Sequence, residues 1–121
     1  MLAGKRAARV GEELLREVAD LLTKKVRDPR VKLATLTGIQ LSNDLRHAKI
    51  FYSFMGEQED IERVQAGLDS AKGFIKRELG FRVELKYMPD IVFTFDPTLE
   101  KARDMETLFE RLRSNDVKDN S

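Results

Sequence analysis

The sequence predicts an α+β fold in which a three-stranded sheet is covered by helices on one face. Two hydrophobic periodicities lead to this prediction. Apolar residues recur at spacings of three and four, as in amphipathic helices, in residues 6–26, 57–71 and 99–112. They alternate with polar residues, as in half-buried strands, in residues 35–42, 47–54 and 91–95. Each strand then offers one apolar side and each helix one apolar stripe, so helices and sheet should pack in layers.

The composition is that of one soluble domain. The chain has 121 residues, of which 41% are hydrophobic and 36% charged, with a formal net charge of +1. We expect a single domain over residues 1–113 and a disordered polar tail over residues 114–121. No apolar run approaches the roughly 20 residues that span a bilayer, and the first residues lack the apolar core of a signal peptide. With no cysteine available for disulfides, a cytoplasmic protein is expected.

Residues 6–26 are predicted to form a long amphipathic helix. Its apolar stripe runs from Val10 to Val26 at spacings of three and four. Cations collect in its last turn, where they interact favourably with the helix dipole. Asp28-Pro29 should end the helix, because a residue that precedes proline is displaced from the helical region.

The next two segments are predicted to form an antiparallel hairpin, joined by a short turn-rich link. The first strand should present one side made of Thr35, Thr37, Ile39 and Leu41. The second strand should present one side made of Ala48, Ile50, Tyr52 and Phe54.

A glycine interrupts the next helical pattern. The apolar spacing of residues 57–71 resumes in a short second helix to Leu79, with Gly80 as its C-cap residue. Gly73 lies between the two, where glycine costs a helix roughly 0.5–1 kcal/mol relative to alanine. We therefore expect a kink at Gly73. Ala71 and Gly73 also leave a bare notch where another backbone, of a protein or of a phosphate chain, could come close.

The third strand is predicted to follow this region. Residues 83–87 alternate, Pro89 interrupts the pattern, and residues 91–95 alternate again. A turn at Pro97 then precedes a final amphipathic helix over residues 99–112.

The sequence is poor in the residue types and motifs that most catalytic sites require. It contains one histidine, His47, and no cysteine, so a zinc site or a histidine-dependent triad is not expected. No glycine-rich phosphate loop of the common spacings occurs. Paired carboxylates such as Glu12 and Glu13 are better explained as a solvated helix surface than as an acid–base pair. We expect no enzyme, no catalytic residue, no metal and no cofactor.

Charge is segregated along the chain. Residues 1–30 are basic, residues 55–71 are acidic, and residues 72–90 are basic again, so the sign changes near Gly73. This pattern indicates one basic face of the kind that binds nucleic acid, although an ordinary solvated surface explains it about equally well. The predicted RNA-binding set is Arg6, Arg9, Lys24, Lys25, Arg27, Arg30, Ala71, Lys72, Gly73, Lys76, Arg77 and Arg82. Three aromatic residues could stack on bases, although a core position is the more common role for them: Tyr52, Phe74 and Phe81.

Several short motifs, at matching spacing, carry a family resemblance. They are Arg9-Val10 with Glu13, Asp28-Pro29-Arg30, Ser42-Asn43-Asp44-Leu45, Ala71-Lys72-Gly73-Phe74-Ile75-Lys76, Pro89 before Ile91, and Asp96-Pro97-Thr98. Together they make the chain resemble the ribosome-binding factor A family, bacterial assembly factors of the small ribosomal subunit. The resemblance covers about residues 9–112.

The resemblance implies a type II KH-like fold, ordered α-β-β-α-kink-α-β, with a three-stranded sheet and a C-terminal helix. Ala71-Lys72-Gly73 would replace the usual loop of KH domains. The implied function is non-catalytic and needs no cofactor. It consists of binding free small ribosomal subunits, their precursors and small-subunit rRNA near its 5′-terminal helix, and so assisting late maturation and rRNA processing, notably in the cold.

No membrane and no small-molecule substrate is expected, and a monomer is the simplest expectation. The alternative is an interaction module whose basic face meets an acidic protein. A hydrolase acting on RNA is a third hypothesis, which the missing histidine and cysteine chemistry disfavours.

Overall fold

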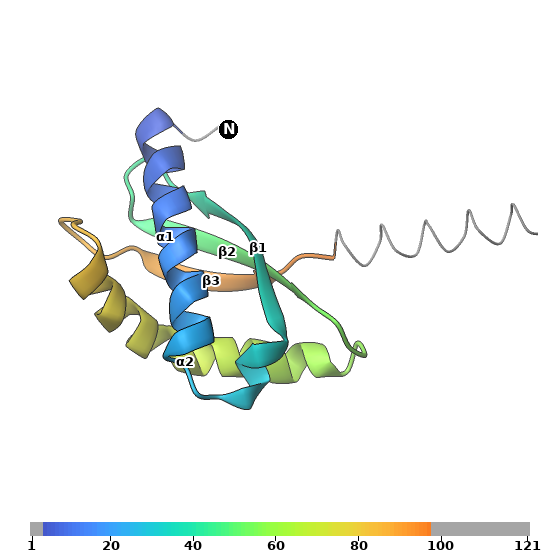
Figure 1. Cartoon of the computed structure of the whole chain (residues 1–121). Coiled ribbons are helices and arrows are strands. Elements are labelled where there is room, and N and C mark those ends of the chain that lie inside the picture. The colour runs from blue at the N-terminus through green and yellow to red at the C-terminus, as the bar shows by residue number, and fades with distance from the viewer. Residues whose placement is uncertain (1–3, 98–121) are drawn as a thin grey trace, which may run out of the picture.

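The computed structural model of the chain describes residues 4–97 and has a mixed α+β fold (Figure 1). Its elements are α1 (Lys5–Lys24), the 3-10 helix η1 (Pro29–Leu33), β1 (Ala34–Leu41), β2 (His47–Phe54), α2 (Asp60–Arg82) and β3 (Asp90–Phe95). The predicted fold class is therefore confirmed. The predicted helix over residues 99–112 and the predicted tail over residues 114–121 lie outside the described residues.

The strands of the described region form one sheet in the order β1-β2-β3. β1 and β2 are antiparallel, which confirms the predicted hairpin, and β3 is parallel to β2. A parallel neighbour needs a crossover connection, and α2 supplies it. In the central strand, Ile50 is paired with Ile39 on one side and with Phe93 on the other.

Both helices pack on the same face of the sheet. Ile50 and Tyr52 of β2 are completely buried, with 0% of their surface exposed. Val18 of α1 and Ile75 of α2 are equally buried, and all four belong to one hydrophobic cluster. Lys49, which points the other way from β2, is exposed. The predicted core side of β2 is therefore confirmed, and Figure 1 shows α1 lying across the strands.

β1 departs from the predicted alternation. Its pairing with β2 shifts between Leu36 and Gly38, which leaves Thr37 as an extra residue in a β-bulge. Leu36 and Ile39 therefore both pack against the core, whereas Thr35 and Thr37 are exposed. The prediction that Thr35 and Thr37 share a side with Ile39 is wrong, because a strict period of two cannot accommodate an extra residue.

α2 is a single helix where the sequence predicted two. It runs through Gly73 and Gly80 and ends at Arg82, so the predicted second helix and the predicted C-cap at Gly80 are wrong. The buried residues Ala71 and Ile75 continue the apolar stripe across Gly73, and this burial offsets the cost of the glycine. The axis of α2 nevertheless changes direction partway along its length (Figure 1). The predicted kink is a bend within one continuous helix.

The segment between α2 and β3 is a loop anchored at both ends. The alternation of residues 83–87 predicted a strand, but the strand begins only at Asp90. Val83 and Pro89 are buried, whereas Tyr87 between them is exposed. The alternation therefore reflects a loop with buried anchors, and the strand prediction for residues 83–87 is wrong.

The side chain of Gln65 links α2 to the sheet through hydrogen bonds. The Tyr52 hydroxyl donates a hydrogen bond of 2.6 Å to Gln65 Oε1. The Gln65 amide donates to the Phe93 carbonyl oxygen at 2.9 Å and to Asp69 Oδ1 at 3.2 Å. Burial, and secondarily the charge of Asp69, raises the pKa of Tyr52 above its usual value, so the hydroxyl stays protonated and able to donate.

We expect Gln65→Ala to lower the free energy of unfolding by about 1–3 kcal/mol, because the buried Tyr52 hydroxyl loses its acceptor. Urea denaturation measures this change. Arg63→Ala is the control on the same helix, since its contact with Asp60 is 3.9 Å long and exposed. The control should change stability by less than about 0.5 kcal/mol. Equal losses in the two variants would contradict a stabilising role for the Gln65 hydrogen bonds.

Two glycines of α2 should respond oppositely to alanine. A Cβ at Gly67 would lie 2.8 Å from Arg30 Cβ and 3.3 Å from Val31 Cγ1, whereas a Cβ at Gly73 would meet nothing within 4 Å. We expect Gly67→Ala to destabilise the fold by about 1–3 kcal/mol through overpacking against η1. Gly73→Ala should stabilise it by about 0.5–1 kcal/mol through helix propensity. Thermal unfolding followed by circular dichroism measures both, and a more stable Gly67→Ala variant would show that η1 is not held against α2.

Candidate nucleic-acid interface

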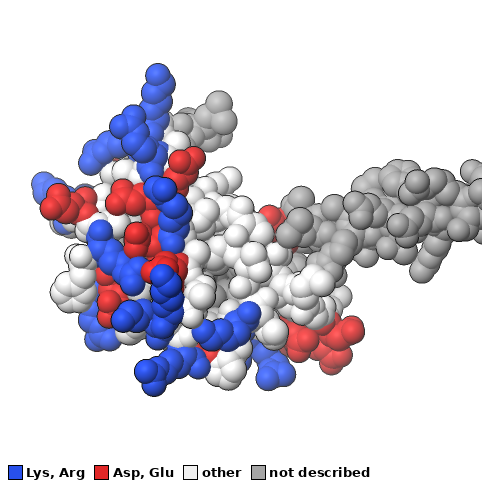
Figure 2. Space-filling model, in the orientation of Figure 1, with Lys and Arg blue, Asp and Glu red and all other residues white. Residues whose placement is uncertain are grey.

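The charged surface of the α1 side is mixed. Figure 2 shows Lys and Arg side chains along this side of the molecule, with Asp and Glu side chains between them. The basic face predicted from the sequence is thus interleaved with acidic groups in this view. The pairing of these charges decides which cations can meet an external ligand.

The C-terminal end of α1 and the middle of α2 enclose a hollow of about 290 Å³, the α1–α2 groove. Lys25 and Arg27 lie on one side of it, and Ser70, Ala71 and Phe74 lie on the other. These residues are far apart in the sequence, and the fold brings them together. Of the predicted RNA-binding set, the groove gathers Lys25, Arg27 and Ala71.

An exposed stripe of α2 continues from this groove. Ser70, Phe74, Arg77 and Phe81 follow one another at spacings of four, three and four, so they share one face of the helix. The Arg77 guanidinium carbon lies 5.8 Å from the centroid of the Phe74 ring. Phe81 is 81% exposed. The stripe therefore combines a cation with two aromatic rings.

Two glycines leave the backbone of α2 bare beside Arg77. A Cβ at Gly73 or at Gly80 would meet nothing within 4 Å, and both glycines are exposed. They lie four residues before and three residues after Arg77, on the same side of the helix. The bare notch was predicted at Ala71 and Gly73. At Gly73 the helix surface is open, so a phosphate chain can approach the backbone closely, whereas Ala71 is buried in the core and is not part of this open surface.

Half of the predicted cations are already paired within the protein. The ion pairs are Lys24 with Asp20, Arg30 with Asp28, Lys72 with Asp69, Lys76 with Asp90, and Arg82 with both Glu17 and Asp20. By contrast, Lys25, Arg27 and Arg77 form no ion pair with any residue in the described range. Exposed cations without a partner can neutralise phosphates at no cost to the fold.

Arg82 links the two helices. Its Nη1 donates hydrogen bonds to Glu17 Oε2 at 2.9 Å and to Asp20 Oδ2 at 2.8 Å. The hydrogen bond from Arg82, followed by that from Lys24, lowers the pKa of Asp20 below its usual value. The same contacts, with Asp20 first and Glu17 second, raise the pKa of Arg82. The structure thus places Arg82 as a bridge between α1 and α2.

Arg30 is also held by an internal partner. Its Nη2 donates to Asp28 Oδ2 at 2.6 Å, and its Nε donates to both Asp28 oxygens at 3.0 Å. The side-chain hydrogen bonds lower the pKa of Asp28 and raise the pKa of Arg30. Asp28 also accepts the Arg30 backbone N–H and so caps η1. This pair fixes the chain directly after Arg27, which lies beside the groove.

Arg6 and Arg9 lie at the opposite end of α1. At 1.5 Å per residue, Arg6 and Lys25 are about 28 Å apart along the helix. The fold therefore does not bring them to the groove. Arg6 instead lines a second hollow with Arg46 and Tyr87, two residues outside the predicted set.

The three candidate stacking residues have different positions. Tyr52 is completely buried, which confirms the core position given as the more common role and excludes stacking on a base. Phe74 is half-buried against the core, and Phe81 is exposed. Periodicity could have separated Phe81 from the core, because the buried residues Ile75 and Leu79 define a stripe that excludes it.

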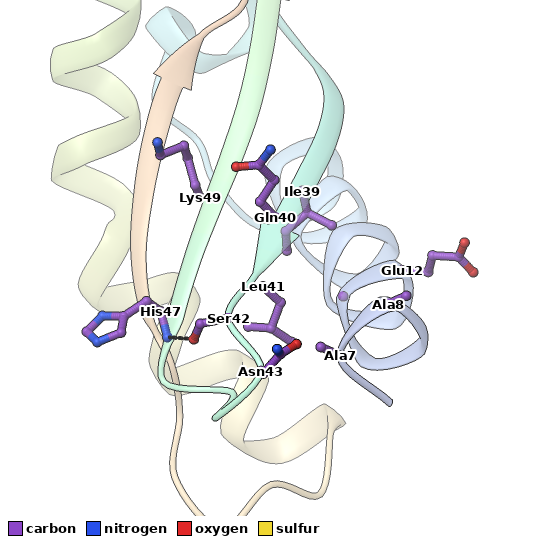
Figure 3. Close-up of a pocket in the computed structure, with 11 residues that line it drawn as sticks. Ala7, Ala8, Glu12, Ile39, Gln40, Leu41, Ser42, Asn43, His47 and Lys49 are labelled. Atoms are coloured by element: carbon purple, nitrogen blue, oxygen red, sulfur yellow. Dashed lines mark hydrogen bonds between the residues drawn. The ribbon is translucent and has the colours of Figure 1, made fainter. Parts of the chain in front are cut away.

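A further hollow of about 810 Å³ adjoins α1 and the edge strand β1 (Figure 3). Figure 3 shows Ile39 and Leu41 of β1 pointing toward α1, whereas His47 and Lys49 point away from it. The walls between α1 and β1 are small and apolar. The lining also includes Glu12, Gln40, Ser42, Asn43, His47 and Lys49, but no residue of the predicted RNA-binding set, so we do not take this hollow as the candidate interface.

The described residues offer a ligand charge, aromatic rings and bare backbone. In residues 4–97, no group of three or more His, Cys, Asp or Glu side chains could hold a metal ion. No helix within that range is long and apolar enough to span a bilayer. His47 is exposed at the start of β2, and its backbone N–H donates to Ser42 Oγ at 3.0 Å.

Comparison with known proteins finds one family and several similar structures. A family model described as ribosome-binding factor A matches residues 6–109. A solution structure of a Thermotoga maritima protein, a candidate ribosome binding factor A, is 28% identical with a TM-score of 0.67. That similarity covers 78% of this chain and 90% of the Thermotoga chain.

Two Thermus thermophilus structures share the fold. The crystal structure of ribosome-binding factor A from this organism is 24% identical with a TM-score of 0.65, covering 74% of this chain and 93% of the other. The second is a homology model of the Thermus thermophilus protein that was fitted into a cryo-EM map of a 30S–RbfA complex. It is 23% identical with a TM-score of 0.62, and covers 75% of this chain and 96% of the other.

The link between Arg82 and Asp20 should make stability depend on pH in the acidic range. Folding lowers the pKa of Asp20 from 3.8, so the folded state favours the ionised carboxylate. This stabilisation is complete above the unfolded pKa and is lost as pH falls through the folded pKa. Arg82→Gln should therefore lower Tm at neutral pH, and its difference from the parent protein should shrink below about pH 4.

Thermal unfolding from neutral to strongly acidic pH measures this difference. Arg77→Gln is the matched control, because Arg77 has no carboxylate partner among the described residues. Its Tm should follow that of the parent protein at every pH. A constant difference for Arg82→Gln down to the lowest pH would show that Asp20 is not the partner that matters.

Proposed function

The chain belongs to the ribosome-binding factor A family, and we propose that it binds the small ribosomal subunit through the α1–α2 groove and the exposed stripe of α2. The observation that carries this proposal is the gathering of unpaired Lys25, Arg27 and Arg77 beside the rings of Phe74 and Phe81. Basic and aromatic groups on one open surface are the combination that proteins use for RNA.

Each part of this surface suits a different part of RNA. Lys25 and Arg27 can neutralise backbone phosphates and release their counterions. The bare helix at Gly73 lets a sugar-phosphate chain come closer than a side chain would allow. Phe81, exposed at the far end of the stripe, offers a ring face to an unstacked base.

The choice of partner is supported by a protein of the same fold. The Thermus thermophilus factor was fitted into the map of a 30S–RbfA complex, so that protein meets the small subunit. In our proposal this chain binds free small subunits and their precursors, at small-subunit rRNA near its 5′-terminal helix. It assists late maturation and rRNA processing, notably in the cold, as a cytoplasmic monomer.

The proposed role is binding without catalysis and without a cofactor. The surface supplies positive charges and aromatic rings. An RNA hydrolase would also need a general acid and a general base, which this surface does not bring together. The second candidate function is a module for an acidic protein, which the same free cations would attract. The exposed ring of Phe81, in the same stripe as the half-buried ring of Phe74, favours RNA over such a partner.

We expect Arg27→Glu and Arg77→Glu each to weaken binding to free small subunits and to precursor rRNA about tenfold or more, because each replaces a phosphate contact by repulsion. Gly73→Val should weaken binding while leaving Tm nearly unchanged, since its Cβ meets no other atom within 4 Å. Filter binding over a range of salt concentrations measures affinity. Each lost phosphate contact should also reduce the slope of log K against log salt by about 0.7–0.9.

Arg63→Glu is the matched control, an exposed charge reversal on the acidic first turn of the same helix. It should leave RNA affinity within about twofold of the parent protein. Unchanged affinity in Arg27→Glu and Arg77→Glu would overturn the assignment of the groove. A parent protein that fails to sediment with free small subunits, but captures an acidic protein, would replace the proposal by its alternative.

A further inference from the structure

Tyr87 is an exposed aromatic ring flanked by cations. It lies in the loop between α2 and β3, and its side chain is 59% exposed. The Arg46 guanidinium carbon is 5.3 Å from the ring centroid, and Lys86 Nζ is 5.6 Å from it. Arg6 of α1 lines the same hollow, of about 310 Å³. The start of α1, the β1–β2 turn and the α2–β3 loop thus bring three cations to one ring.

This hollow has an excess of positive charge. Its lining includes one carboxylate, Asp44, against Arg6, Arg46 and Lys86. Asp44 Oδ1 accepts hydrogen bonds from the Ser42 hydroxyl at 2.6 Å and from the Arg46 backbone N–H at 3.0 Å, and its single negative charge offsets only part of the three positive charges. None of the three cations forms an ion pair within residues 4–97. Like charges gathered in this way repel one another, so an anionic ligand would stabilise the cluster.

The backbone around Arg46 is firmly held. The Leu45 N–H donates to the Ser42 carbonyl oxygen at 2.9 Å, and Leu45 takes a φ of 62°, in the left-handed region that leucine seldom enters. The Arg46 carbonyl oxygen accepts the Asp90 N–H at 2.9 Å, which joins the turn to β3. The held backbone reduces the main-chain part of the ordering cost when Arg46 binds a ligand, and its exposed side chain is the part that must still be ordered.

We propose that Arg6, Arg46, Lys86 and Tyr87, the Tyr87 cluster, bind an unpaired nucleotide of RNA. Its base stacks on the Tyr87 ring, and its flanking phosphates lie against the three cations. Aromatic stacking with adjacent cations is the chemistry of single-strand recognition, and it tolerates any base because every base has a π face. An acidic protein segment would meet only the cations, whereas a nucleotide also presents a ring to Tyr87, which lies beside Arg46 and Lys86.

The cluster lies away from the α1–α2 groove. Arg6 and Lys25 mark the two sites and are about 28 Å apart along α1. A ligand that meets both must therefore be large, as a folded ribosomal RNA is. This inference rests on the proposed function. It adds a second RNA-binding site, the Tyr87 cluster, which selects an unpaired nucleotide.

The test uses the full chain, a labelled single-stranded RNA oligonucleotide of mixed sequence, and the same RNA annealed to its complement. Tyr87→Ala should weaken single-strand binding about tenfold and leave duplex binding unchanged. Tyr87→Phe keeps the ring and should bind like the parent protein. Arg46→Gln and Lys86→Gln should each reduce the salt slope for the single strand by about 0.7.

A second readout reports the stacking directly. The chain has no tryptophan, so Tyr87→Trp places a single indole at the cluster. Its fluorescence should be quenched on addition of the single strand and should change much less with the duplex. Because Tyr87 is exposed, the Tm of every variant should match that of the parent protein. A loss of affinity that follows a loss of Tm would count against the proposal.

The outcomes separate this inference from the proposed function. If Arg27→Glu weakens RNA binding and Tyr87→Ala does not, the Tyr87 cluster is not an RNA site and the proposed function stands. If Tyr87→Ala and Tyr87→Phe weaken binding equally, base stacking is overturned. If the parent protein binds neither RNA, both proposals fail. Tyr87-dependent binding of a polyglutamate peptide in place of RNA would assign the cluster to an acidic protein.

Discussion

The fold depends on covering one face of a three-stranded sheet with two helices, each of which carries a single apolar stripe. The central strand places Ile50 and Tyr52 at the middle of this layer, where neither keeps any exposed surface. A tyrosine at such a position brings a hydroxyl into the core, and that hydroxyl needs a partner. Gln65 of α2 meets this need and also bonds to the carbonyl of Phe93 in β3. Gln65 therefore supplies the acceptor that the buried hydroxyl needs and also fixes the position of α2 on the sheet.

The position of the α1–α2 groove is a consequence of this packing. Because both helices must cover the same face, the C-terminal end of α1 lies against the middle of α2, and Lys25 and Arg27 come to lie opposite Phe74. Two arginines, with three ion pairs between them, support this arrangement. Arg82 joins α2 to α1, and Arg30 holds η1 beside Gly67 of α2.

Ion pairing also sorts the cations by role. Where a carboxylate lies within reach, the cation supports the fold, as Arg82 does with Glu17 and Asp20. Where none of the described residues supplies one, the cation is available to a ligand. Two groups of available cations lie towards the two ends of α1, one beside Phe74 and the other around Tyr87, whereas Arg16 and Lys49 lie outside both groups. A near-neutral chain can thus present two basic surfaces, since its acidic groups are used elsewhere.

The sequence by itself determined the helix α1, the strand β2, the hairpin, the family and the poverty of catalytic groups, because periodicity, turn residues and residue types are local properties. The sequence also placed Lys25, Arg27 and Arg77 among the candidate RNA contacts. It did not show that Arg82 and Arg30, two other members of that set, are held in ion pairs within the protein. Only the tertiary structure decided the bulge in β1, the continuity of α2 through its glycines, the loop before β3 and the exposure of Tyr87 beside Arg46. Each of these depends on contacts between residues far apart in the chain, whose energies no local pattern contains.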